Sequence, residues 1–174
     1  MVLLVKAAVE ARLNVQLYTY YAANWGAPEA MGTAAADKVK AVFRWHPNAG
    51  IEEERIAMQE FQRRYNLGYG AMPSSNEFGM LAKAIDTSGS TDPLRVAYAL
   101  EDLRIQGSMG EVWMRADDHQ LFEPMYIMTL TPVNGKDVKY GLSGTNIGTR
   151  TDARFEISET LVPTRCQMKR PPKP

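Results

Sequence analysis

The most informative stretch of the chain reads Gly110-Glu111-Val112-Trp113-Met114-Arg115-Ala116-Asp117-Asp118-His119-Gln120, and Pro124-Met125-Tyr126-Ile127 follows shortly after it. Side chains alternate in polarity over 111–115, and 124–130 is mostly apolar and β-favouring, which predicts a strand at each place. The polar residues 117–120 between the two segments predict a turn, because Asp side chains satisfy backbone N–H groups in turns.

Two helices are predicted before this stretch. Residues 74–77 read Ser-Ser-Asn-Glu, a capping box, and apolar residues at 78, 81, 82 and 85 mark the inner face of the helix that follows. Gly89 ends that helix, and Asp92-Pro93 starts the next one, because proline is tolerated in the first turn. We expect the two helices to pack as a hairpin.

The first 66 residues predict helices that alternate with strands. Apolar residues repeat at helical spacing over 2–13, with Asn14 as a left-handed cap, and strand-like segments cover 15–21 and 39–45. A weak helix at 28–35 and a helix capped by Asn48 complete the pattern. This alternation predicts an α/β fold with a parallel sheet flanked by helices. A further short strand is predicted at 138–142.

These segments together resemble a known family. The likeness is carried by residues 81–85, 88–93, 96–100, 110–120 and 124–127. They resemble the carboxy-terminal half of the periplasmic solute-binding proteins of branched-chain amino acid ABC transporters, the Leu/Ile/Val type of type I periplasmic binding protein. The resemblance implies a two-lobed α/β fold, in which a small-molecule solute is trapped in the cleft between the lobes and presented to an ABC permease.

The resemblance also implies how the chain divides. We expect a second-lobe α/β segment at 1–66, a helical hairpin of the first lobe at 67–106, crossover strands returning to the second lobe at 107–145, and an irregular carboxy-terminal tail at 146–174. Family members are much longer than 174 residues and periplasmic. We therefore expect a fragment whose first lobe and export signal lay upstream, or alternatively a cytoplasmic remnant.

Composition narrows the range of partners. Twenty basic and twenty acidic residues cancel, and they are interspersed along the chain, so neither nucleic acid nor an anionic membrane is expected as a partner. No apolar run approaches the roughly 18 residues of a membrane span. Cys166 is the only cysteine, which excludes an intrachain disulfide. It is either a free thiol or the former partner of a cysteine in the absent half.

No catalytic, metal or cofactor site is predicted. Asp117, Asp118 and His119 fit a structural turn better than a set of metal ligands, because the only other histidine, His46, is far away in the sequence. The Gly-x-Ser-x-Gly elbow of serine hydrolases is absent, and no glycine-rich phosphate loop follows a strand. We therefore expect a protein that is not an enzyme and binds no cofactor.

The aromatic turn at 18–26 is the predicted ligand surface. It follows a predicted strand, and in open α/β sheets ligands gather outside the carboxyl ends of the strands. Phenol and indole groups have flat apolar faces with polar tips, which suits a small organic solute. We assign the contacts to a group of four residues, Tyr20, Tyr21, Asn24 and Trp25. The alternative is that Tyr18 and Tyr20 are ordinary core aromatics.

One departure from the family bears on the ligand. The resemblance places an acid near position 21 in members that bind amino acids, where it holds the ammonium group of the ligand. This chain has no Asp or Glu between Glu10 and Glu29. Because a buried ammonium without a counter-charge is costly, an aromatic acid or another weakly polar solute fits better than leucine or valine.

A second function stays open. Bare sheet edges and apolar faces, such as the loss of a lobe would leave, recruit partners. The alternative is therefore a truncated remnant that acts as a self-associating or partner-binding structural module without a transport role. A homo-oligomer is expected in that case.

Overall fold

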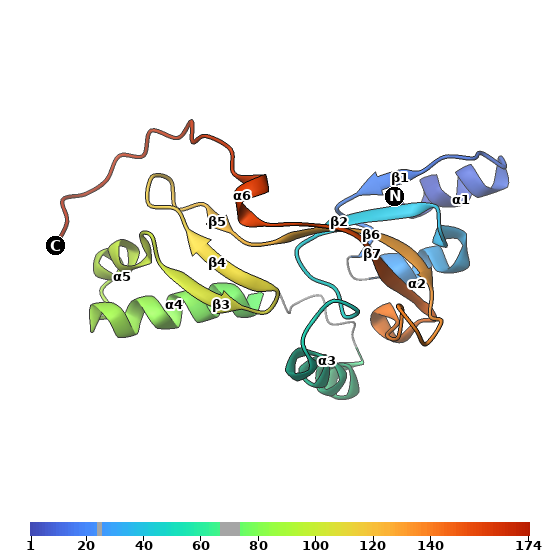
Figure 1. Cartoon of the computed structure of the whole chain (residues 1–174), viewed down its shortest axis with the longest axis horizontal. Helices are drawn as coiled ribbons and strands as arrows, with labels where there is room; N and C mark the ends of the chain where they lie inside the picture. The colour runs from blue at the N-terminus through green and yellow to red at the C-terminus, as the bar shows by residue number, and fades with distance from the viewer. Residues whose placement is uncertain (24–25, 67–73) are drawn as a thin grey trace. The chain divides into compact units, whose positions relative to one another are not determined.

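The chain forms two compact units, shown in Figure 1. The computed structural model describes residues 1–23, 26–66 and 74–174. Unit 1 comprises Met1–Met72 and Met125–Arg154, and unit 2 comprises Pro73–Pro124 and Phe155–Pro174. The chain therefore passes from one unit to the other three times.

Unit 1 is built on a four-stranded sheet in the order β1-β2-β6-β7. The strands are β1 (Leu17–Thr19), β2 (Val39–Phe43), β6 (Met125–Pro132) and β7 (Ile147–Phe155). β1 and β2 are parallel with Leu17 opposite Val39, whereas β2 and β6 are antiparallel with Ala41 opposite Met128. The predicted α/β class is confirmed, and the sheet is mixed, with the predicted parallel pairing between β1 and β2.

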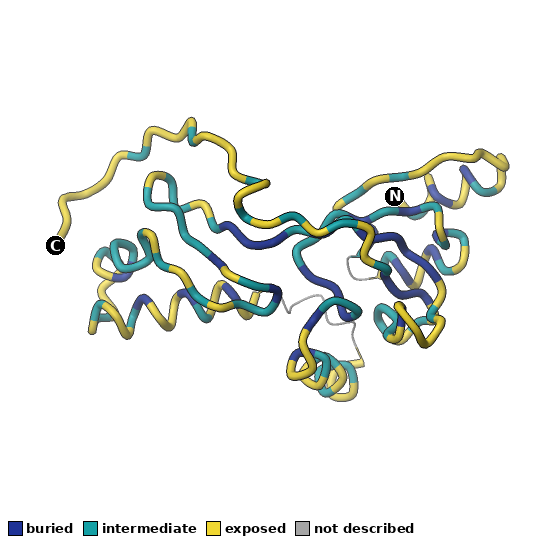
Figure 2. Tube along the Cα trace, viewed as in Figure 1, coloured by how far each residue is buried: buried dark blue, intermediate teal, exposed yellow. Residues whose placement is uncertain are grey.

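One face of this sheet is covered by short helices. They are α1 (Val2–Glu10), α2 (Ala27–Met31) and the 3-10 helix η1 (Gly32–Ala35). The buried apolar cluster beneath them consists of Val5, Ala22, Met31, Ala35, Val39, Ala41, Met128, Leu130 and Ile147. Val39 and Ala41 enter this cluster from β2 while Lys40 points to the other face, as the two-residue period of a strand requires. Figure 2 shows the central strands as the most buried part of this unit.

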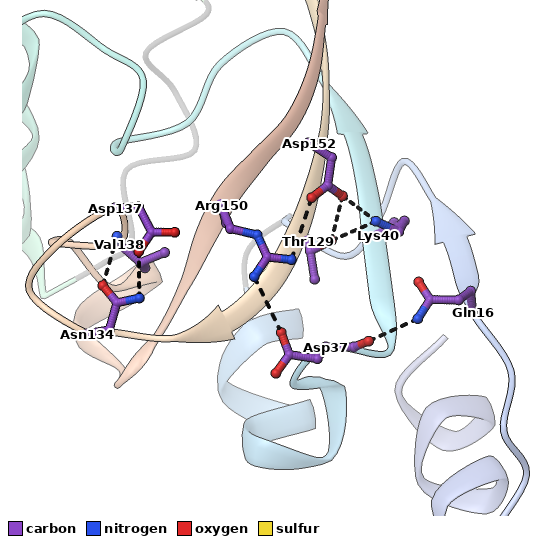
Figure 3. A network of polar contacts seen from close by, with 9 residues as sticks. All are labelled: Gln16, Asp37, Lys40, Thr129, Asn134, Asp137, Val138, Arg150 and Asp152. Carbon is purple, nitrogen blue, oxygen red and sulfur yellow. Dashed lines mark hydrogen bonds and ion pairs between the residues drawn. The ribbon is translucent and has the colours of Figure 1, made fainter.

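The opposite face of the sheet carries charged side chains (Figure 3). Lys40 Nζ donates to Thr129 Oγ1 at 2.9 Å and also to Asp152. Arg150 lies 3.7 Å from Asp152 and 3.9 Å from Asp37. Because Lys40, Thr129 and Asp152 come from β2, β6 and β7, the network joins three neighbouring strands.

Unit 1 also contains helix α3 (Glu52–Tyr65). Its first turn holds Glu52, Glu53 and Glu54 and its last turn holds Arg63 and Arg64, which matches the polarity of the helix dipole. The predicted cap is wrong, because Ile51 and not Asn48 occupies the N-cap position. The Asn48 side chain is engaged with residues 139 and 140 instead.

Unit 2 combines a helical hairpin with an antiparallel sheet. Helices α4 (Ser74–Ser88) and α5 (Pro93–Leu100) pack together, which confirms the predicted hairpin. Gly89 has φ +59° after α4, and Asp92 caps α5 by accepting a 3.0 Å hydrogen bond from the backbone N–H of Arg95. The sheet order is β3 (Arg104–Gly107), β4 (Gly110–Met114) and β5 (Leu121–Phe122). Strand β3 was not predicted.

The polar turn after β4 is held by one ion pair. Arg115 Nε and Nη2 donate to the two carboxylate oxygens of Asp118 at 2.9 and 2.6 Å, and Asp118 accepts from the backbone N–H of Gln120 at 3.1 Å. Asp118 therefore has the structural role that was expected of it. The turn leads into the short strand β5 before β6 begins, so it does not join the two predicted strands directly.

Three predicted elements differ from the structure. Residues 147–155 form β7, so the predicted irregular tail begins only after α6 (Ile157–Thr160); the outer half of β7 is polar and exposed, which hides its strand pattern. Residues 138–142 are not a strand, because the side chains of Asn134 and Asn48 bind the backbone N–H groups of 138–140. Helix α1 ends at Glu10, and Arg12 rather than Asn14 adopts a positive φ, of +53°.

The assignment of segments to the lobes of a larger fold stays a prediction. The compact units group the chain in another way, since residues 107–124 lie in unit 2 with the helical hairpin and 146–154 lie in unit 1.

Candidate functional site

The turn that follows β1 leaves its tyrosines in solvent. Tyr20 and Tyr21 are 65% and 67% exposed and Tyr18 is 60% exposed, so Tyr18 and Tyr20 are not core aromatics. Ala22 is fully buried and anchors the turn in the core of unit 1. The predicted contacts Asn24 and Trp25 lie outside the described residues. The structure therefore places two of the four predicted contact residues, Tyr20 and Tyr21, on an accessible turn.

A cavity of about 390 Å³ lies within unit 1 and reaches the end of this turn at Ala23. The end of β2 and the residues after it contribute Phe43, Trp45, His46 and Pro47. Helix α3 contributes Met58, Gln59, Gln62 and Arg63. The segment 139–144, which contains the 3-10 helix η2 (Leu142–Gly144), contributes the remaining described lining residues. This volume is in the range of small-molecule sites in proteins.

The position of the cavity follows from the parallel pairing of β1 and β2. Parallel strands end at the same edge of a sheet, so the residues after Thr19 and those after Phe43 emerge side by side. The cavity therefore meets the aromatic turn at the sheet edge where ligands of open α/β proteins gather.

Trp45 ties the end of β2 to helix α3. Its indole Nε1 donates a 2.8 Å hydrogen bond to Glu54 Oε2, and both residues are buried. Burial raises the pKa of the Glu54 carboxyl, and the hydrogen bond from Trp45 partly offsets this effect. The bond holds the indole in place as a wall of the cavity.

His46 is the most buried polar group in the lining. It is 1% exposed, its Nδ1 lies 3.0 Å from Thr149 Oγ1, and its Nε2 lies 2.9 Å from Thr151 Oγ1. Tyr126 packs edge-on against the imidazole, with ring centroids 5.5 Å apart. Burial lowers the pKa of His46 to about 4, so the ring is neutral at pH 7. It therefore acts as a polar, uncharged part of the wall.

Asn48 holds the segment 139–144, which lines the cavity. Its Oδ1 accepts from the backbone N–H groups of Lys139 and Tyr140 at 2.8 and 2.9 Å, and its Nδ2 donates to the carbonyl of Tyr140 at 2.9 Å. Gly141 is required next to this clamp, because a Cβ there would lie 1.8 Å from the carbonyl oxygen of Thr145. The geometry of 139–144 is thus set by side-chain clamping and close backbone packing.

The cavity residues were missed at the sequence level. One sequence signal could have found part of the lining. The predicted strands 15–21 and 39–45 can be parallel neighbours, and ligands gather outside the carboxyl ends of such strands. The same rule that selected the turn after the strand at 15–21 therefore also selects the residues at the end of the strand at 39–45, which include 45–47 of the lining. The contributions of α3 and 139–144 had no such signal, because they depend on contacts between residues far apart in the chain.

His119 and Cys166 are not among the described lining residues of the cavity. His119 Nε2 lies 3.3 Å from Glu101 Oε1, and Cys166 is an exposed free thiol. Within residues 1–23, 26–66 and 74–174, no group of three or more His, Cys, Asp or Glu side chains is arranged to hold a metal ion.

The sequence matches a family of known proteins over most of its length. Residues 1–137 match the family described as periplasmic binding protein. The chain belongs to the periplasmic binding protein family. A curated relative, the Leu/Ile/Val-binding protein homolog 4 of Brucella melitensis biotype 1, is 27% identical over 183 residues, which cover 98% of this chain and 42% of the relative. The chain thus spans less than half the length of this relative of the Leu/Ile/Val type.

Solved structures of other proteins share the fold of this chain. The Leu-, Ile-, Val-, Thr- and Ala-binding protein of Brucella ovis, in a closed conformation, aligns with a TM-score of 0.82 at 24% identity, over 98% of this chain and 44% of that one. A solute-binding protein of an ABC transporter from Rhodopseudomonas palustris BisB5, in complex with 3,4-dihydroxybenzoic acid, aligns with a TM-score of 0.66 at 13% identity, over 88% of this chain and 41% of that one. Both are solute-binding proteins.

None of the helices in the described part of the chain has both the length and the apolar character to cross a membrane.

Proposed function

We propose that this chain is part of the solute-binding component of an ABC importer and that it binds a small organic solute. The observation that carries the proposal is the exposed Tyr20–Tyr21 turn, which stands at the carboxyl edge of β1 and β2 beside a cavity in a chain of the periplasmic binding protein family. Tyr20, Tyr21, Asn24 and Trp25 contact the solute as a group. In the full-length protein the solute is held in the cleft between two lobes and is presented to an ABC permease in the periplasm.

The chemistry of the site favours an aromatic acid over an amino acid. Neither the segment between Glu10 and Glu29 nor the described lining of the cavity contains a carboxylate that would pair with the ammonium group of an amino acid. Both ligand classes occur among the similar proteins, since the Brucella ovis protein is a Leu-, Ile-, Val-, Thr- and Ala-binding protein and the Rhodopseudomonas protein was solved with a dihydroxybenzoic acid. The exposed phenol rings offer stacking surfaces for a planar ligand.

Calorimetric titration with hydroxybenzoic acids and with leucine, isoleucine and valine tests this proposal. We expect the hydroxybenzoic acids to bind at least about tenfold more tightly, because an unpaired ammonium loses its hydration without compensation. Replacing Tyr20 and Tyr21 together by alanine should weaken binding, whereas Tyr65→Ala, which removes a similarly exposed tyrosine from α3, should not. If the Tyr20→Ala/Tyr21→Ala variant binds every solute as tightly as the native chain does, the proposal is contradicted.

A second candidate function rests on the exposed apolar side chains of α1. Leu3 is 83% exposed and Leu4 is 55% exposed, while Val5 and Ala8 on the other side of the helix are buried. Such residues are available for a partner chain or a second copy, as a self-associating module without a transport role requires. Light scattering at micromolar concentration tests the self-associating module. If the native chain and the Leu3→Glu variant are both monomeric, the second candidate is removed.

A further inference from the structure

The described lining of the unit 1 cavity combines apolar residues with positively charged ones. Phe43, Trp45, Met58, Tyr140 and Leu142 supply apolar surface from three different segments. The charged residues of the described lining are Arg63 and Lys139, and no Asp or Glu accompanies them. A ligand in this cavity therefore meets apolar walls and positive charge, without a carboxylate.

The two cations are not equivalent. Arg63 Nε and Nη2 already donate to the carboxylate of Glu60 at 2.8 and 2.7 Å, and Glu60 pairs with Arg64 as well. Within the part of the chain that the structure describes, Lys139 has no ion-pair partner. Among the described residues of the lining, Lys139 is therefore the cation whose ammonium group is not already engaged in an ion pair, and it lies on the segment that Asn48 clamps in place.

Gln62 and His46 are two further polar residues of the lining. The side-chain amide of Gln62 has no hydrogen-bond partner among the described residues, so its N–H groups are available to a ligand. His46 is held between two threonine hydroxyls and stays neutral at pH 7, because burial lowers its pKa to about 4. The imidazole of His46 therefore adds no charge to the cavity.

We infer that this cavity binds a compact monocarboxylate with a flat apolar body and no ammonium group. The carboxylate accepts hydrogen bonds from Lys139 Nζ and the Gln62 amide, and the body lies against Trp45 and Met58. This inference names the substrate class and therefore rests on the proposed function, but it places the anion at the cavity and not at the tyrosine turn. A charge-assisted hydrogen bond to the carboxylate and the absence of a counter-charge for an ammonium group together set the selectivity.

Three probes of similar size test the inference on the 174-residue chain. Benzoate carries the carboxylate, benzamide has the same shape without the charge, and L-phenylalanine adds an ammonium group. Binding is followed by calorimetry and by quenching of tryptophan fluorescence, to which Trp45 in the cavity wall contributes. We expect benzoate to bind with a Kd of about 1 mM or tighter, and benzamide and L-phenylalanine each at least about tenfold more weakly.

A pair of lysine variants locates the anion. Lys139→Met removes the charge at the cavity and keeps the length of the side chain, whereas Lys136→Met removes an exposed charge three residues earlier that does not line the cavity. We expect Lys139→Met to weaken benzoate binding about tenfold and to leave benzamide binding unchanged. Lys136→Met should bind both probes as the native chain does.

Each other outcome overturns the inference. Equal binding of benzoate and benzamide, or equal loss in the two lysine variants, shows that no cation at the cavity reads the carboxylate. Benzoate binding that is lost in the Tyr20→Ala/Tyr21→Ala variant but kept in Lys139→Met moves the anion to the turn, which leaves the proposed function standing and removes this inference. Failure of all probes and of the hydroxybenzoic acids removes both.

Discussion

The indole Nε1 of Trp45 donates a hydrogen bond of 2.8 Å to the buried carboxylate of Glu54. Trp45 follows β2 and Glu54 lies in the first turn of α3, so this bond connects the sheet of unit 1 to the helix that forms the other side of the cavity. Glu54 is 7% exposed, and burial raises its pKa, so the carboxylate depends on this donor. The relationship makes the cavity wall sensitive to changes at either residue.

Trp45→Phe should destabilise unit 1 because it leaves the Glu54 carboxylate buried without its donor. A hydrogen bond to a charged group contributes about 2 kcal/mol, and the lost indole ring volume adds a packing cost. A double-mutant cycle with Trp45→Phe and Glu54→Leu, measured by urea unfolding, separates the hydrogen bond from the packing cost, because neither replacement can form the bond. We expect a coupling energy of about 2 kcal/mol. A coupling energy of zero would show that the bond does not contribute to the stability of the folded chain.

The folded chain should lose stability in acid because His46 is buried in its neutral form. Its pKa is lowered from 6.5 to about 4, so the unfolded state binds a proton more readily than the folded state between these values. The stabilisation is complete above pH 6.5 and is lost as the pH falls toward about 4. The loss amounts to about 3 kcal/mol.

The control for this prediction is His46→Gln. Glu54 has the opposite effect, because its raised pKa favours protonation of the folded state, so the native chain alone does not isolate His46. The difference in unfolding free energy between the native chain and His46→Gln should shrink between pH 7 and pH 4. A difference that stays constant over this range would mean that the imidazole is not kept neutral by burial.

The features predicted correctly from the sequence depend on neighbouring residues. The helical hairpin of unit 2 was predicted from Gly89 and Asp92-Pro93, whose effects reach at most one helical turn. The strands at 17–19, 39–43 and 125–132 were predicted from composition and alternation. Strand β7 was missed, because only its first three residues are buried and its exposed half reads as a polar loop.

The features that were missed depend on residues far apart in the sequence. Asn48 was predicted to cap α3, but its side chain binds backbone groups 91 and 92 positions later. No local pattern distinguishes the two roles of an asparagine, since both satisfy backbone N–H groups. The cavity was missed for the same reason, because its lining brings together the end of β2, the helix α3 and the segment 139–144. The tyrosine turn was found because one general rule about sheet edges applies to a single strand.

Asn48→Ala should release the segment 139–144 and weaken ligand binding in the cavity. It removes three hydrogen bonds to residues 139 and 140 and leaves their backbone groups without those partners. We expect a loss of about 2 to 3 kcal/mol in unfolding free energy. Asn48→Asp keeps the acceptor for both N–H groups and loses only the donation to Tyr140, so it should cost about 1 kcal/mol. Equal costs for the two variants would assign the clamp to packing and not to hydrogen bonding.

Gly141→Ala should distort the same segment through backbone contact. A Cβ at this position would lie 1.8 Å from the carbonyl oxygen of Thr145 and 3.0 Å from its carbonyl carbon, and these backbone atoms move only if the turn around η2 opens. We expect a cost of about 3 kcal/mol, in line with overpacking of a tightly packed site. Gly135→Ala is the matched control: it introduces a methyl group into open space at φ +72°, so it reports only the cost of a left-handed residue, about 1 kcal/mol. Urea unfolding measures both costs, and hydrogen exchange at Lys139 and Tyr140 shows whether the Asn48 clamp has opened. If Gly141→Ala costs no more than Gly135→Ala and leaves exchange at both amides slow, then the close approach to Thr145 is not what shapes the cavity wall.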